Sequence, residues 1–79
     1  MAIYKYAAYL TDNGNEQFDK LYNPGATTPH SAIYRCMNCH REVVSEADKP
    51  LPPQNHHSHT PSQGAIVWKM IVFADHDPK

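Results

Sequence analysis

The clearest hydrophobic pattern in this chain lies near its C-terminal end. Residues 65–73 are apolar at every position except Lys69. Extended backbone would place Ile66, Trp68, Met70 and Val72 on one face and Val67, Lys69, Ile71 and Phe73 on the other. A strand that is apolar on nearly both faces is typical of a central position in a sheet. The pattern therefore predicts that 65–73 forms a central strand.

Weaker patterns predict three further strands. The segment from Ile3 to Leu10 alternates and is rich in tyrosine, which favours a strand. Ser31–Arg35 and Glu42–Ser45 are two short segments on either side of a compact turn, and together they predict a hairpin.

The intervening segments are rich in turn-forming residues. Asn13-Gly14 either closes a hairpin or precedes a helical turn over Glu16 to Leu21 that Asn15 caps. Further residues that interrupt helices and strands follow, from Asn23-Pro24-Gly25 to Pro29, so we expect a long and mobile loop over 11–31. Pro50-Leu51-Pro52-Pro53 favours extended polyproline backbone, which would act as a stiff lead-in to the residues that follow it.

These elements predict a mostly β domain with a small three-stranded antiparallel sheet. The domain would span 31–74, after an N-terminal strand and long flexible loop over 1–30 and before a frayed tail over 75–79. Six side chains would supply most of its core: Tyr34, Val43, Ile66, Trp68, Met70 and Ile71.

The size and composition of the chain indicate that this core needs support. The 79 residues are 41% hydrophobic and include seven prolines, and a core of this size rarely supplies more than ~3–5 kcal/mol. A disulfide between Cys36 and Cys39 would close only a tiny loop, where the entropic gain is smallest. Structural zinc contributes on the order of 10–16 kcal/mol of folding free energy. A bound metal would therefore stabilise this small core more than the disulfide would.

The arrangement of cysteines and histidines predicts such a metal. The chain has two cysteines, Cys36 and Cys39, and sixteen residues separate Cys39 from His56. His56 and His59 repeat the spacing of the cysteines, and His57 is an alternative ligand. Two thiolates and two neutral imidazoles are a tetrahedral zinc set without net charge, which eases burial. We therefore predict one Zn²⁺ per chain on Cys36, Cys39, His56 and His59.

Two other kinds of site compete with this interpretation. Cys36-Met37-Asn38-Cys39-His40 matches the attachment sequence of c-type haem, with His40 as the proximal ligand and Met70 or Met37 opposite. No export signal is visible in the sequence, so we do not expect the export that this attachment requires, and few helices are predicted to enclose a porphyrin. In the zinc interpretation His40 instead follows the turn at a position that needs left-handed backbone, which His tolerates.

The other competitor is a small zinc-dependent hydrolase or nuclease. Glu42 would be its general base, and Asn55-His56-His57 superficially matches His-Asn-His nucleases. The net charge of −1 and the scattered lysines and arginines do not support nucleic-acid binding. The longest apolar run, about ten residues, is too short for a membrane span. We expect a soluble, cytoplasmic protein with reduced thiols and no membrane contact.

Three features of the chain resemble small bacterial zinc-ribbon proteins: Ile33-Tyr34-Arg35-Cys36-Met37-Asn38-Cys39, then Leu51-Pro52-Pro53, and finally Trp68. In that group of short proteins of undefined function, some named protein L, an aromatic residue precedes the cysteine pair and Leu/Phe-Pro-Pro precedes the second ligand pair. The likeness covers roughly Ser31 to Val72, with histidines where ordinary ribbons carry cysteines. It implies a zinc-ribbon-like (rubredoxin-like) fold whose second knuckle follows Pro53, and it implies no reaction.

We therefore predict a zinc-stabilised interaction module without catalytic activity. A protein is the expected partner, since the charge of the chain does not favour nucleic acid. The N-terminal tyrosines, or an exposed face of Trp68, would form the contact surface.

Overall fold

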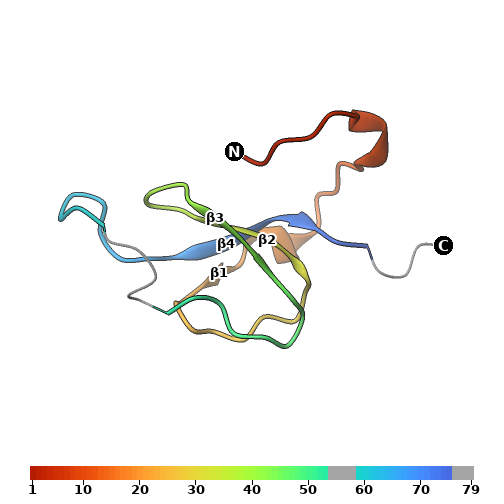
Figure 1. The fold of residues 1–79 in the computed structure, drawn as a ribbon. Helices are drawn as coiled ribbons and strands as arrows, with labels where there is room; N and C mark the ends of the chain where they lie inside the picture. Colours follow the sequence, from red (N-terminus) through yellow and green to blue (C-terminus); the bar gives the residue numbers. More distant parts are fainter. Residues whose placement is uncertain (54–58, 76–79) are drawn as a thin grey trace.

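A four-stranded antiparallel sheet forms the centre of the protein in a computed structural model, which describes residues 1–53 and 59–75 (Figure 1). The strands are β1 (Leu21–Tyr22), β2 (Ala32–Cys36), β3 (Glu42–Ser45) and β4 (Trp68–Phe73). Their order is β1-β4-β2-β3, so β4 has a neighbour on each side. The prediction of a small, mostly β antiparallel domain with a central C-terminal strand is confirmed, although the strand begins at Trp68 and the two-residue β1 was not expected.

The β2–β3 hairpin forms as the sequence predicts. Its register pairs Ala32 with Ser45 and Arg35 with Glu42. The alternation of β2 is strict: Ala32, Tyr34 and Cys36 are buried, whereas the two residues between them are half-buried. Because side chains of successive strand residues point to opposite faces, one face of the sheet holds the core.

Two loops cover this core face. Figure 1 shows the segments 23–31 and 46–53 on one side of the sheet. Thr28 and Leu51 are fully buried beneath the sheet, and the Leu51 amide donates a hydrogen bond to the Ala26 carbonyl at 2.8 Å. The buried hydrophobic residues are Ala32, Tyr34, Cys36, Leu51, Ile66, Trp68 and Met70. Leu51 therefore belongs to the core, although the sequence predicted its segment only as an extended lead-in.

A β-bulge changes the predicted faces of β4. Tyr34 pairs with Met70 and Ile33 pairs with Val72, so Ile71 is an extra residue in the ladder. Opposed residues share a face, and Val72 consequently lies on the face of Ile33 and not with Met70. The predictions that Val72 shares the face of Trp68 and that Ile71 is a main core residue are wrong, since Ile71 is only half-buried.

The strand predicted over Ile3 to Leu10 does not form. Ala7–Tyr9 is instead a short 3-10 helix, η1, and most side chains of the segment are exposed. Strand propensity reflects packing against cross-strand neighbours, and no described strand pairs with these residues. No helix within 1–53 and 59–75 is long and apolar enough to span a membrane.

The helical alternative at Asn15 is the correct one. The Asn15 side chain accepts a hydrogen bond from the Gln17 amide at 2.8 Å and caps η2 (Glu16–Asp19). This short 3-10 helix lies against β4, and Phe18 packs onto the edge of the core. Part of the region expected to be a long loop is therefore ordered by η2 and β1.

Candidate metal centre

The tight turn between β2 and β3 brings Cys39 back beside Cys36, the last residue of β2. The Cys36 amide donates to the Arg41 carbonyl, and the His40 amide donates to the Cys36 carbonyl, both at 2.8 Å. His40 has a φ of 68°, in the left-handed region that few non-glycine residues adopt. The predicted backbone role of His40 is confirmed, and its side chain is exposed.

Three candidate ligand atoms meet beside this turn. Those of Cys36, Cys39 and His59 all lie within 4.8 Å of one another. The Cys36 sulfur is 3.5 Å from His59 Nε2. Ligand atoms of tetrahedral zinc are about 3.3–3.8 Å apart, given Zn–S bonds of ~2.3 Å and Zn–N bonds of ~2.0 Å. These residues could therefore hold a metal ion with little movement.

His59 is oriented toward the cysteines by its second ring nitrogen. Nδ1 lies 2.7 Å from the Gly64 carbonyl, so the tautomer that donates from Nδ1 leaves the Nε2 lone pair facing the sulfur atoms. Metal-binding histidines commonly use their other nitrogen in this way. Gly64 has a φ of 76°, which a residue with a side chain adopts only at a cost.

The loop that carries Gly64 is attached to the cysteine turn. The Met37 amide donates to the Val67 carbonyl at 2.8 Å, and the Asn38 side-chain amide donates to the Ala65 carbonyl. Figure 1 shows the turn and the loop at the same end of the sheet. The sequence analysis did not identify Asn38 or Gly64 as supports of the site, because turn-forming residues predict a loop without indicating what the loop contacts.

The environment of Cys36 favours a thiolate. Burial raises the pKa of this thiol, but hydrogen bonds from the main chain at Val67, Asn38 and Cys39 and from the Cys39 side chain outweigh burial and lower the pKa to about 7. The thiolate is the form that binds metal. Cys36 and Cys39 form no disulfide, and Cys39 is half-buried.

The other predicted site residues lie elsewhere. His56 and His57 are outside the described residues. Glu42 pairs with Arg35 on the sheet face opposite to Cys36, and its carboxylate lies 3.2 Å from the Met1 ammonium. Of the proposed ligand set, the structure thus brings together Cys36, Cys39 and His59.

Comparison with known proteins agrees with the resemblance that the sequence suggested. No protein-family model and no solved structure matches the chain. The chain is 54% identical over 79 residues to a protein of Escherichia coli called protein L, and the match covers 95% of this chain and 90% of that protein. Identity at this level along nearly the whole of both proteins shows common descent, and the chain belongs to the protein L family.

Proposed function

We propose that this protein is a zinc-stabilised interaction module without catalytic activity. One Zn²⁺ would be held by Cys36, Cys39 and His59, with a fourth ligand from the preceding histidines, His56 first and His57 as the alternative. The observation that carries the proposal is the convergence of three ligand atoms within 4.8 Å. Zinc binds a donor set of two sulfurs and an imidazole more favourably than harder cations such as Mg²⁺ and Ca²⁺ do.

A zinc-ribbon-like arrangement is the fold that this proposal implies. Its support is the way the candidate ligands are delivered. Cys36 is the last residue of β2, Cys39 lies on the hairpin turn between β2 and β3, and His59 lies on the loop that leads into β4. Because β2 pairs with β4, a metal between the turn and the loop would join the ends of these neighbouring strands.

A structural role is favoured over a catalytic one by the surroundings of the cluster. Catalytic zinc keeps an open position next to a general base. Among the described residues no carboxylate joins the cluster, and Glu42 lies on the opposite face of the sheet. The burial of Cys36 also favours a structural role for the metal.

The same burial argues against covalent haem. A thioether bond at Cys36 would require the edge of a porphyrin to reach a sulfur that has no exposed surface. His40, the axial ligand in that alternative, is exposed and outside the cluster. We place the protein in the cytoplasm, where metal-binding thiols stay reduced, and we propose a protein as its partner because its exposed surface includes many large hydrophobic side chains.

The test is the metal content of the purified protein, measured by elemental mass spectrometry together with an absorbance scan. We expect about one zinc per chain, as for a single tetrahedral site, and no Soret band. Cys39→Ser should lose the metal and much of its amide chemical-shift dispersion. Iron with a Soret band, or a Cys39→Ser protein that melts like wild type, would refute the proposal.

His40→Asn is the matched control. Asn also tolerates left-handed backbone, so the turn should form and zinc should remain bound. The variant also removes the axial ligand that the haem alternative requires. That alternative therefore predicts that His40→Asn loses axial ligation of the haem iron. Retained zinc in His40→Asn beside lost zinc in Cys39→Ser would separate ligand loss from damage to the turn.

A further inference from the structure

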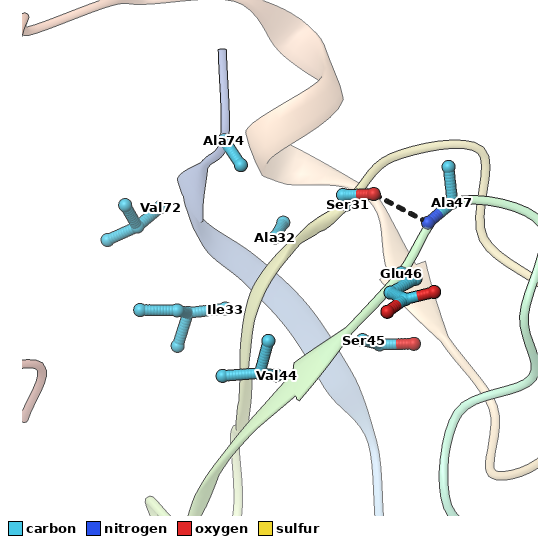
Figure 2. Close-up of a pocket in the computed structure, with 9 residues that line it drawn as sticks. All are labelled: Ser31, Ala32, Ile33, Val44, Ser45, Glu46, Ala47, Val72 and Ala74. Atoms are coloured by element: carbon cyan, nitrogen blue, oxygen red, sulfur yellow. Dashed lines mark hydrogen bonds between the residues drawn. The ribbon is translucent and has the colours of Figure 1, made fainter. Parts of the chain in front are cut away.

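The sheet face opposite to the core carries an apolar row. Ile33 pairs with Val44 on one side and with Val72 on the other. Figure 2 shows these three side chains projecting to the same side of neighbouring strands. They line a groove of about 490 Å³, and Val44 is 81% exposed. Ile33 and Val72 are half-buried, so the row is a partly exposed hydrophobic surface on three adjacent strands.

A charged row lies beside it. Arg35 pairs with Glu42 on one side and with Lys69 on the other. The Glu42 carboxylate is at the end of this row on the edge strand β3. The face thus presents an apolar stripe next to a carboxylate at one end.

The N-terminal arm, residues 1–10, has the complementary chemistry. Its exposed side chains include Ile3, which is 97% exposed, and Tyr4, which is 63% exposed. Its tip is the Met1 ammonium, 3.2 Å from the Glu42 carboxylate. Figure 1 shows the arm on the side of the sheet away from the two loops that cover the core.

Within one chain the arm lies near this face at its two ends. Tyr9 and Leu10, at its base, line a second groove of about 840 Å³ with Val72, and Met1 reaches Glu42. No arm residue lines the groove over the apolar row. Val44 on the face and Ile3 and Tyr4 on the arm are consequently exposed to solvent.

We propose that this face is a homodimer interface in which two copies exchange arms. Each arm would lie across the apolar row of the other copy, with its ammonium at that copy's Glu42. The exchange forms the ion pair of the single chain again and also buries the apolar residues of the arm. A two-fold arrangement of this kind is closed, because both copies use the same two surfaces.

Releasing the arm breaks the ion pair at its tip, which joins the ammonium of Met1, whose side chain is 88% exposed, to the carboxylate of Glu42, whose side chain is 17% exposed. The exchange forms this pair again in the other copy, so breaking it within one chain does not oppose association. Exposed hydrophobic surface on both halves favours association. This proposal names a partner for the interaction module proposed above, but it is independent of the metal, because Cys36 lies on the other face of the sheet.

The test is the mass of the zinc-loaded full chain by sedimentation equilibrium over a series of concentrations. We expect a dimer for wild type and a monomer for Val44→Lys, which places a charge in the apolar row. Thr27→Lys adds the same charge on a loop over the core face and should remain dimeric. The zinc content of all three proteins is measured in parallel. If it is equal, a loss of the dimer cannot be attributed to a loss of the metal site.

Mixing two monomeric variants tests the exchange itself. Ile3→Asp/Tyr4→Asp disables the arm and keeps the face, whereas Val44→Lys disables the face and keeps the arm. Under exchange the mixture forms a heterodimer through one intact contact. A monomeric wild type, a dimeric arm variant, or a mixture without heterodimer would each overturn the proposal.

Discussion

The glycine beside the candidate metal centre offers the sharpest test of how the site is built. Gly64 holds a φ of 76°, and its carbonyl lies 2.7 Å from His59 Nδ1. A methyl group added at this position would have Asn38 Nδ2 as its nearest neighbour, at 3.9 Å, which is ordinary contact. The cost of Gly64→Ala should therefore come from the backbone alone.

That cost can be estimated from the left-handed conformation. An L-residue with a side chain pays roughly 1–2 kcal/mol there. In a domain of this size each kcal/mol lowers the melting temperature by about 4–8 °C. Gly25→Ala is a matched control, because Gly25 has a φ of 79° and open space around it. Gly14→Ala should cost nothing of this kind, since Gly14 has no positive φ and no close neighbour.

The assay combines urea unfolding with the visible spectrum of the cobalt-loaded protein. Both Gly64→Ala and Gly25→Ala should lose about 1–2 kcal/mol of unfolding free energy. Only Gly64→Ala should shift the cobalt ligand-field bands, because only Gly64 orients a candidate ligand. The reasoning is refuted if Gly64→Ala unfolds like wild type, or if Gly25→Ala alters the spectrum as strongly.

Two further predictions concern the core. Leu51→Ala should lose about 2–5 kcal/mol, as buried leucines do, whereas Leu21→Ala, at a residue 63% exposed, should change little; equal melting temperatures would contradict the burial of Leu51. Tyr34→Phe should lose about 1–2 kcal/mol at neutral pH, because the buried hydroxyl donates to the His30 carbonyl at 2.8 Å. Burial raises the pKa of Tyr34 above 10.0, so its stabilisation is present below pH 10 and is lost as the pH rises through the raised pKa. The difference in melting temperature between wild type and Tyr34→Phe should therefore become smaller at alkaline pH. A difference that stays constant would argue against a stabilising hydrogen bond from the protonated Tyr34 hydroxyl.

Local patterns in the sequence were sufficient to predict the structure where the conformation of a residue depends on its neighbours along the chain. The hairpin of β2 and β3, the cap at Asn15 and the left-handed backbone at His40 follow from short-range chemistry, and the structure has all three. The position of the cysteine pair follows from the same hairpin. These features do not depend on how distant segments pack.

Features that depend on distant segments were not predicted. The bulge at Ile71 is a feature of the pairing between β4 and β2, and periodicity along one strand contains no information about that pairing. Leu51 is buried because its loop folds back beneath the sheet. The segment Ile3 to Leu10 alternates like a strand but has no described partner strand. The Gly64 contact to His59 likewise depends on the three-dimensional path of a loop.

The five residues of β2 connect both proposed surfaces of the molecule. Tyr34 and Cys36 point into the core and toward the candidate metal centre, while Ile33 points to the opposite face. A register shift of one residue would exchange these faces, so the metal centre and the apolar row depend on the same register. In β4, Trp68 lies opposite Cys36, and the bulge at Ile71 places Val72 opposite Ile33. A thin sheet can in this way present the proposed metal centre on one side and the proposed contact surface on the other.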